Sequence, residues 1–217
     1  MKVVVVASGE LDPSDGAWLH NADLVVAADG GADSLDRLGR RPDLLVGDLD
    51  SAEASLVERL AASGTRVERH PIDKEASDTE LAIEAAFGAG GSTVVLLGAL
   101  GGDRLDHELA NLLLLADPAM AGRDLRAVRG GTCVRALHAA DRLLLEGEAG
   151  DVVTLLPVGG DAGGVTTEGL RWALDAATLR MGRSRGLSNE ILNGTASVRI
   201  GQGTLLVVET ASTGGIS

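Results

Sequence analysis

The chain has 217 residues, of which 19 are Lys or Arg and 32 are Asp or Glu, so its formal net charge is −13. A chain this acidic is unsuited to binding nucleic acid or an anionic membrane surface, because both partners are themselves negatively charged. One Cys excludes an internal disulfide and a cysteine-based metal centre, and two Trp, one Phe and no Tyr are too few for a base-stacking platform.

Residues 1–130 alternate between short apolar runs and helical patterns, which is typical of βαβ units and a mostly parallel sheet. The predicted strands are Val3–Ala7, Leu24–Ala28, Leu44–Val46, Arg66–Arg69, Thr93–Leu97 and Leu125–Val128. The predicted helices are Ala32–Leu38, Ala52–Ala62, Asp78–Phe87 and Asp106–Ala116. Gly39 and Gly64 follow two of these helices as C-terminal caps, and Ser77 opens the third in a capping box.

Residues 131–217 have a different pattern, with short apolar runs separated by glycines and no long helix. The predicted strands are Thr132–Leu137, Arg142–Leu145, Val152–Leu156, Gly164–Thr167, Ala196–Ile200 and Thr204–Val208. Regular short strands of this kind indicate a small antiparallel sandwich or barrel-like domain, and we expect its boundary near residues 130–140.

The N-terminal run Met1–Val6 leads directly into a strand-like pattern without a charged leader or a cleavage site. No run approaches the roughly 18 consecutive apolar residues of a membrane span. We expect a soluble, cytoplasmic globular protein.

Charge is concentrated in the first part of the chain, with 12 basic and 23 acidic residues in 1–130 against 7 and 9 in 131–217. Four polar clusters lie where predicted strands lead into helices, at residues 28–32, 47–51, 73–78 and 98–107. An open α/β sheet presents such loops to a ligand at the carboxyl ends of its strands. The chain has neither a GxxxxGK[ST] loop nor a strict GxGxxG motif, so a phosphate ligand would be held by another arrangement.

Carboxylates in these clusters are candidate metal ligands. Asp48 and Asp50 are two residues apart, so on an extended backbone both side chains point the same way. Converging carboxylates repel unless a cation neutralises them, and oxygen ligands at a phosphate site suit Mg²⁺. The alternative is that Asp50 caps a helix beginning at Ser51 and that Asp78 belongs only to its capping box.

The segment from Gly98 to Asn111 gathers glycine, arginine, aspartate and histidine in one junction. Gly101 and Gly102 permit close approach of backbone to a ligand, and Arg104 offers a planar fork for phosphate oxygens. Asp106 and His107 begin a helix whose amide end favours anions. Alternatively, the glycines form a turn, Arg104 pairs with a neighbouring aspartate, and the histidine is solvated.

In the second part, Trp172 follows Gly169-Leu170-Arg171, and Ser188-Asn189 adds a hydroxyl and an amide that can hydrogen-bond to the edge of a heteroaromatic ring. The alternative for Trp172 is a core position, which is commoner for a lone tryptophan in a small β domain.

Six separated blocks, taken in order, resemble the thiamine diphosphokinase (thiamin pyrophosphokinase) family. They are residues 29–32, Pro42-Asp43 with 47–51, 74–78, 101–111, 169–172 and 188–190, so the resemblance runs from Ala28 to about Glu190. The chain departs from the usual family pattern in the Glu75-Ala76-Ser77-Asp78 block, at Ala173 after the tryptophan, and at Asp103, which lengthens the Gly-Gly-Arg spacing.

The resemblance implies an N-terminal Rossmann-like α/β domain over 1–130 that binds ATP and Mg²⁺, and a C-terminal antiparallel β-sandwich over 131–217 that binds thiamine. It implies a homodimer with each active site between subunits. The implied Mg²⁺ ligands are Asp48, Asp50 and Asp78, with Lys74 and Arg104 as further catalytic residues. The implied ATP-site residues are Asp29, Gly30, Gly101, Gly102, Arg104, Asp106 and His107. The implied thiamine-binding residues are Trp172, Ser188 and Asn189.

The expected reaction transfers the diphosphoryl group of ATP to the thiamine hydroxyl and releases AMP. Either Asp48 or Asp78 could instead orient the hydroxyl. The alternatives are a diphosphokinase acting on a pterin alcohol, which would use the same acids, and a non-catalytic sensor of nucleotides or thiamine derivatives.

Overall fold

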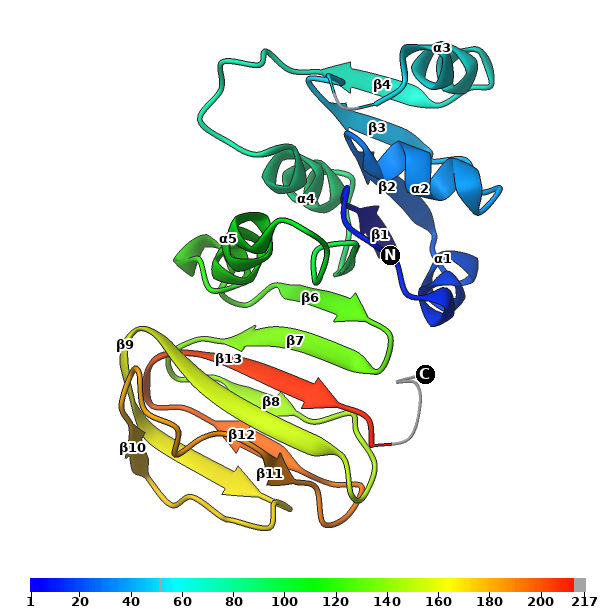
Figure 1. The fold of residues 1–217 in the computed structure, drawn as a ribbon. Coiled ribbons are helices and arrows are strands. Elements are labelled where there is room, and N and C mark those ends of the chain that lie inside the picture. The colour runs from blue at the N-terminus through cyan, green and yellow to red at the C-terminus, as the bar shows by residue number, and fades with distance from the viewer. Residues whose placement is uncertain (51, 213–217) are drawn as a thin grey trace. The chain divides into compact units, whose positions relative to one another are not determined.

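A computed structural model describes residues 1–50 and 52–212 of the chain (Figure 1). Contacts between residues divide the chain into two compact units. Unit 1 comprises Met1–Asn111 and Arg123–Arg129, and unit 2 comprises Leu112–Gly122 and Gly130–Ser217.

Unit 1 is built on a parallel sheet of six strands in the order β4-β3-β2-β1-β5-β6. The strands are β1 (Lys2–Val6), β2 (Leu24–Ala28), β3 (Leu44–Gly47), β4 (Arg66–Arg69), β5 (Thr93–Leu97) and β6 (Asp124–Arg129). All six predicted strands are confirmed to within a residue or so at either end. The β-branched run of β1 is fully buried because helices cover the sheet, as the near-continuous apolar character of its strands requires.

The helices of unit 1 lie on both faces of this sheet, with α1 (Gly16–His20), α2 (Gly31–Arg37) and α3 (Ala54–Ala62) opposite α4 (Asp78–Gly88) (Figure 1). Helix α5 (Leu105–Leu115) begins in unit 1 and ends in unit 2, and of two short 3-10 turns η1 (Pro13–Asp15) belongs to unit 1 and η2 (Pro118–Met120) to unit 2. The sequence predicted α2 to α5 but missed α1, which is short. Among the described residues, no helix is long and apolar enough to cross a membrane.

Local capping explains where these helices begin and end. The Ser77 hydroxyl accepts a hydrogen bond from the Glu80 amide at 3.2 Å, which confirms Ser77 as the N-cap of α4, and Gly39 and Gly64 adopt positive φ after α2 and α3 as predicted. In contrast, α3 begins at Ala54 with Glu53 at its N-cap. The interpretation of Asp50 as the cap of this helix is therefore wrong.

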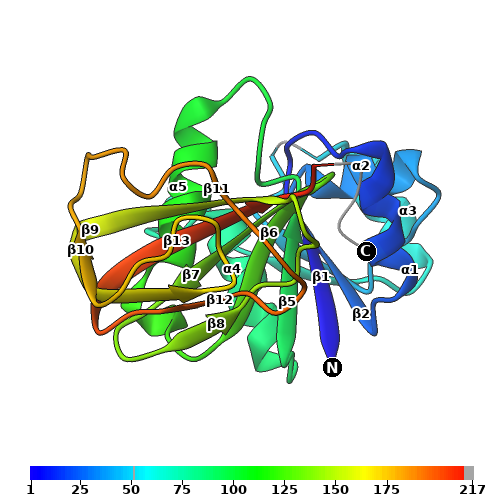
Figure 2. The same ribbon diagram turned by 90° about the horizontal axis from the view of Figure 1, so that it is seen from below.

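Unit 2 is antiparallel and centres on one long strand, β9 (Val152–Glu168), which runs beside β13 (Gln202–Thr210) (Figure 2). The first half of β9 pairs with β13, and its last residues pair with β12 (Ser197–Arg199). Strands β7 (Thr132–Leu137) and β8 (Arg142–Leu144) pair with β13 and β12 respectively. Because β9 changes partners along its length, it belongs both to a sheet with β13 and β7 and to a sheet with β12 and β8. These two sheets enclose one core, which contains Leu155, Val198 and Leu205.

The sequence predicted the antiparallel class of unit 2 but divided β9 into two strands, Val152–Leu156 and Gly164–Thr167. Gly159 and Gly160 adopt positive φ inside β9, so residues that normally mark a turn instead bend a continuous strand. The short strands β10 (Ala177–Leu179) and β11 (Asn189–Glu190) also pair with β9 and were not predicted.

Candidate active site

A pocket of about 320 Å³ lies where the strand order of unit 1 reverses, beyond the carboxyl ends of β1 and β5. The chain leaves these adjacent strands in opposite directions, so the loops that follow them separate and leave a crevice. The pocket is lined by Ala7, Ser8, Gly9, Glu10, Thr79, Gly98, Ala99, Gly101, Gly102, Asp103, Arg104, His107, Glu108 and Asn111. Eight of these residues have polar or charged side chains and four are glycines, which suits a polar ligand.

Backbone hydrogen bonds join the two loops at the base of the pocket. The Ala7 amide donates to the Leu97 carbonyl at 2.8 Å, and the Gly9 amide donates to the Gly98 carbonyl at 3.0 Å. A Cβ at Gly9 would lie 2.3 Å from the Gly98 carbonyl oxygen, so only glycine permits this approach.

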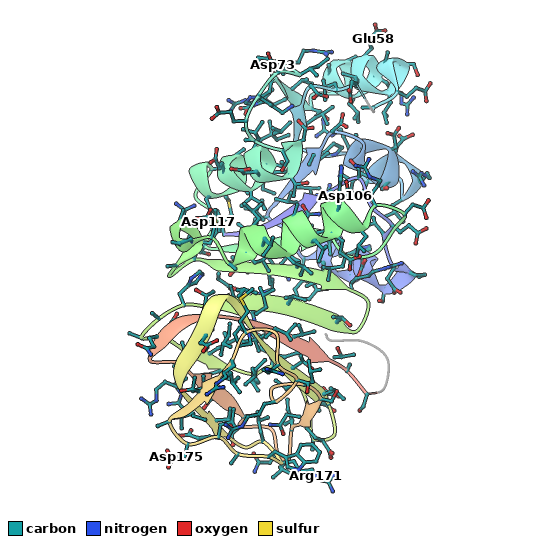
Figure 3. All side chains as sticks on the ribbon, turned by 60° about the vertical axis from the view of Figure 1, so that its left-hand side comes forward. Glu58, Asp73, Asp106, Asp117, Arg171 and Asp175 are labelled. Carbon is teal, nitrogen blue, oxygen red and sulfur yellow. The ribbon has the colours of Figure 1, made fainter. Side chains whose placement is uncertain are left out.

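Four of the predicted nucleotide-site residues, Gly101, Gly102, Arg104 and His107, line this pocket. Asp106 is not part of the lining, but it pairs with Arg104 at 2.6 Å, at the N-terminal end of α5 (Figure 3). Both side chains are 65 % exposed. The Arg104 guanidinium holds the pKa of Asp106 far below its usual range, and Asp106 raises the pKa of Arg104. The predicted ion pair is therefore present, and Arg104 also faces the pocket.

Sequence reasoning missed the loop after β1 and several residues of the helices. The missed lining residues are Ala7, Ser8, Gly9, Glu10 and Thr79, while Glu108 and Asn111 lie in the segment 98–111, which the sequence singled out, but had no role assigned. The segment after β1 carries Glu10, Asp12 and Asp15, but the sequence reasoning considered only the four later strand-to-helix junctions. The available signal was topological, because a loop after the first strand of a doubly wound sheet lies at the switch point.

Three carboxylates from different elements converge at the same edge of the sheet. Asp29 follows β2, Asp48 follows β3 and Asp78 begins α4, and each offers an oxygen within 4.8 Å of the others. Gly47 makes this possible, because a Cβ there would lie 3.0 Å from the Asp78 Oδ1 and 3.1 Å from the Asp29 Cβ. Gly30, predicted beside Asp29, is the N-cap of α2.

Lys74 lies against two of the three acids. Its Nζ is 2.9 Å from the Asp48 Oδ2 and 3.0 Å from the Asp78 Oδ1. The hydrogen bond from Lys74 lowers the pKa of Asp48, and although burial alone would lower the pKa of Lys74, its hydrogen bonds to Asp48 and Asp78 raise it. Asp48 therefore stays ionised beside the Lys74 ammonium.

Asp50 lies outside this group of three. Leu49 adopts a φ of +64°, so the backbone turns between the two acids and the Asp50 side chain is exposed. The Asp50 amide donates to the Asp48 Oδ1 at 3.2 Å. The expectation of an extended backbone that aligns both carboxylates is wrong, and Asp50 as a metal ligand stays a prediction. Ser51, the next residue of that cluster, lies outside the described residues.

In unit 2, Trp172 is 59 % exposed, so the core interpretation of this residue is wrong. The Arg171 guanidinium lies over its ring at 5.4 Å and pairs with Glu190 at 2.8 Å, at a surface of unit 2 where Figure 3 labels Arg171. An exposed indole held from one side offers its other surface to a flat ligand.

Asn189 holds Trp172 through its backbone. The Asn189 Oδ1 accepts from the Trp172 amide at 3.0 Å, and its Nδ2 donates to the Trp172 carbonyl at 2.8 Å. Asn189 is buried, whereas Ser188 is exposed at a φ of +56°. The structure thus brings the three predicted residues together, with the amide of Asn189 directed at protein backbone.

Fold and pocket together define a doubly wound α/β protein with a pocket at the topological switch point, followed by an antiparallel β unit. Two family models match the chain: "Thiamin pyrophosphokinase, catalytic domain" over residues 16–126 and "Thiamin pyrophosphokinase, vitamin B1 binding domain" over residues 142–205. The chain belongs to the thiamin pyrophosphokinase family.

Individual relatives agree with this membership. Thiamine pyrophosphokinase 2 of Oryza sativa subsp. japonica is 28 % identical over 198 residues, which cover 79 % of this chain and 72 % of that protein. The Bacillus subtilis thiamine pyrophosphokinase is 21 % identical over 211 residues, or 96 % of this chain and 98 % of that protein.

Solved structures establish the fold. The crystal structure of the Bacillus subtilis thiamine pyrophosphokinase matches with a TM-score of 0.85 at 22 % identity, covering 98 % of this chain and 100 % of that one. The thiamin pyrophosphokinase of Candida albicans matches with a TM-score of 0.80 at 16 % identity, covering 96 % and 88 %. The predicted fold class, a parallel α/β domain followed by antiparallel strands, is confirmed.

Proposed function

We propose that this chain is a thiamine diphosphokinase that forms thiamine diphosphate and AMP from thiamine and ATP. The observation that carries the proposal is the adjacency, at one edge of the parallel sheet, of a polar pocket at the switch point and a group of three carboxylates with a lysine. We assign ATP and Mg²⁺ to a catalytic domain at 1–130 and thiamine to a binding domain at 131–217. ATP as a substrate favours the cytoplasm as the place of action.

Mg²⁺ fits the acidic group by the chemistry of its donors. Its ligands are oxygens about 2.0–2.1 Å from the ion, and it is held by one or two protein carboxylates with water and substrate phosphates. Asp48 and Asp78 would supply two carboxylates, and Asp29 or Asp50 a third. When bound, the ion neutralises phosphate charge and orients the phosphate oxygens.

The transfer needs little covalent participation by the protein. The thiamine hydroxyl oxygen bonds to the β-phosphorus of ATP, the bond from that phosphorus to the oxygen bridging it to the α-phosphate breaks, and AMP leaves. The hydroxyl proton passes to solvent, or to Asp48 or Asp78. Catalysis then depends on in-line placement and on neutralised charge.

Cationic side chains would neutralise the negative charge of the ATP phosphates. Arg104 faces the pocket with a planar guanidinium, and the pocket loops offer backbone amides to phosphate oxygens. Lys74 contacts Asp48 and Asp78, two of the proposed metal ligands, so its ammonium would add positive charge beside the phosphates. Asp106 holds Arg104 through a two-point ion pair, with its Oδ1 2.9 Å from Nε and its Oδ2 2.6 Å from Nη2.

Trp172 is the proposed contact for the flat, cationic thiamine rings, with Ser188 beside it and Asn189 holding its backbone. We expect Trp172→Ala to raise the KM for thiamine about 10-fold and to leave the KM for ATP unchanged, since stacking on an aromatic ring contributes about 1–3 kcal/mol. Steady-state kinetics with each substrate varied in turn measures both constants. Trp172→Phe keeps an aromatic surface and serves as the control, with a smaller rise. An unchanged thiamine KM in Trp172→Ala would remove this residue from the site.

Exposed apolar side chains support the proposed homodimer. Leu105, Leu109 and Leu113 follow one another at every fourth position on α5 and are 66 %, 51 % and 59 % exposed. In unit 2, Trp172, Met181 and Leu187 are also about half exposed. Apolar surfaces of this kind commonly mark protein interfaces.

We expect Leu109→Glu to convert the dimer to a monomer, because it places a charge in the middle of the leucine stripe. Size-exclusion chromatography with light scattering measures the mass. Ala110→Glu, at the next and also exposed position of α5, is the matched control and should remain dimeric. A wild-type chain that is monomeric at micromolar concentration would contradict the dimer.

The acceptor is tested by supplying ATP and Mg²⁺ with either thiamine or a hydroxymethylpterin. The proposal predicts AMP release with thiamine and only background release with the pterin alcohol. AMP release that depends on the pterin, or on neither acceptor, would contradict it.

A further inference from the structure

Arg129 is the last residue of β6 and lies next to two loops that line the pocket. Because β6 is parallel to β5, its carboxyl end lies at the same edge of the sheet as the loops after β1 and β5. Its Nη2 donates to the Glu10 Oε2 at 3.0 Å. Glu10 lines the pocket from the loop after β1, whereas Arg129 is not part of the lining.

The same guanidinium also lies against Gly101 in the opposite loop. A Cβ at Gly101 would be 1.5 Å from the Arg129 Nη1 and 2.5 Å from its Cζ. Gly101 has a φ of +77°, which disfavours any other residue independently of the space. Arg129 therefore occupies the volume that a side chain at Gly101 would take, and it touches one residue of each pocket wall.

These contacts of Arg129 connect the loop after β1 with the loop after β5 at a second place, farther from the strand ends than the backbone hydrogen bonds. At the base, hydrogen bonds hold Ala7 and Gly9 to the backbone after β5. Further out, Gly98, Gly101 and Gly102 all have positive φ, so that loop has few side chains to restrict it. Arg129 supplies an ion pair and a packed surface at this outer level.

The charge of Arg129 has a separate consequence. Glu10 is a carboxylate in the wall of a pocket assigned to a polyanion, and its side chain is 72 % exposed. Its Arg129 partner offsets this charge. Without the arginine, the carboxylate would repel the phosphates of ATP.

We propose that Arg129 is a positioning residue for ATP, which neutralises Glu10 and holds it and Gly101 in place on the two sides of the pocket. The inference rests on the proposed function, since it assigns this pocket to ATP. Arg129 acts through these two residues and not by contact with the reacting atoms.

The test is a comparison of Michaelis constants. Arg129→Ala should raise the KM for ATP about 10-fold, with kcat within 2-fold of wild type and the KM for thiamine unchanged. Arg129→Lys, which keeps a positive charge toward Glu10, should stay within about 3-fold of the wild-type KM for ATP. Glu10→Gln combined with Arg129→Ala should recover part of the loss, because the unneutralised carboxylate is gone.

Arg59→Ala is the matched control, because it removes another ion pair of unit 1, with Asp36 at 2.7 Å, in which both side chains are about half exposed. It should leave every constant unchanged. A wild-type KM for ATP in Arg129→Ala, or a loss confined to kcat, would overturn the inference.

Calorimetric binding of the unreactive analogue α,β-methylene-ATP separates this inference from the proposed function. Weaker binding by Arg129→Ala than by wild type supports the positioning role even if thiamine yields no AMP, a result that would reject only the proposed function. Equal binding by both proteins rejects the positioning role even if the wild type is fully active with thiamine.

Discussion

Asp48→Asn should fold normally and lose about 100- to 1,000-fold of its kcat/KM for AMP release, the usual effect of removing one group that stabilises transition-state charge. The amide has the shape of the carboxylate but no charge, and Asp48 lies among Asp29, Asp78 and Lys74, where that charge is needed. Calorimetric titration with Mg²⁺ in the presence of α,β-methylene-ATP should show a parallel loss of metal affinity.

Three further substitutions test whether the effect of Asp48→Asn is specific to the proposed metal site. Asp36→Asn removes an exposed acid of α2 that pairs with Arg59, and it should retain wild-type turnover. Comparison of Asp29→Asn with Asp50→Asn identifies the third carboxylate, which is the one whose loss weakens Mg²⁺ binding more. Near-wild-type turnover and Mg²⁺ affinity in Asp48→Asn would contradict the metal assignment.

The second prediction with a large expected effect concerns the free energy of unfolding and an ion pair buried inside unit 2. The Arg135 Nη2 is 2.9 Å from both carboxylate oxygens of Glu209, and the side chains are 7 % and 3 % exposed. Burial raises the pKa of Glu209 although Arg135 opposes the shift. Glu209→Gln should therefore lower the free energy of unfolding by about 3 kcal/mol, the low end for a buried pair that loses one partner, because among the described residues Arg135 keeps only one ion pair, with the half-exposed Glu146 at 3.1 Å.

Replacement of both partners distinguishes this explanation from a loss of packing. Arg135→Met with Glu209→Leu should be more stable than Glu209→Gln, because no buried charge remains. Arg142→Met breaks a more exposed pair with Glu168 in the same unit and should cost no more than about 1 kcal/mol. Urea unfolding followed by circular dichroism measures all three. A Glu209→Gln variant as stable as Arg142→Met would show that the buried pair contributes little.

The six strands of unit 1 and the helices α2 to α5 were predictable because each has a strong local pattern. Arg66–Arg69 and Thr93–Leu97 were predicted with their observed bounds, and capping residues defined the ends of α2 and α4. In unit 2, β9 was divided because glycine favours both turns and bends within a strand. Two-residue and three-residue strands such as β10 and β11 exist because β9 lies beside them, so no local pattern could reveal them.

The candidate site was predictable in its residue types and less so in its geometry. Asp48, Lys74 and Asp78 were found from the sequence, and the structure brings them together. The orientation of Asp50 depends on the positive φ of Leu49, a conformation that leucine rarely adopts and that sequence does not reveal. The roles of Glu10 and Arg129 depend on which loops the sheet order brings together.

The most direct test of the central claim, diphosphoryl transfer to thiamine, is ³¹P NMR of the products formed from ATP, thiamine and Mg²⁺. The account predicts AMP and thiamine diphosphate in equal amounts, with neither formed when thiamine is omitted. ADP with thiamine monophosphate, or AMP accompanied by free pyrophosphate, would contradict it.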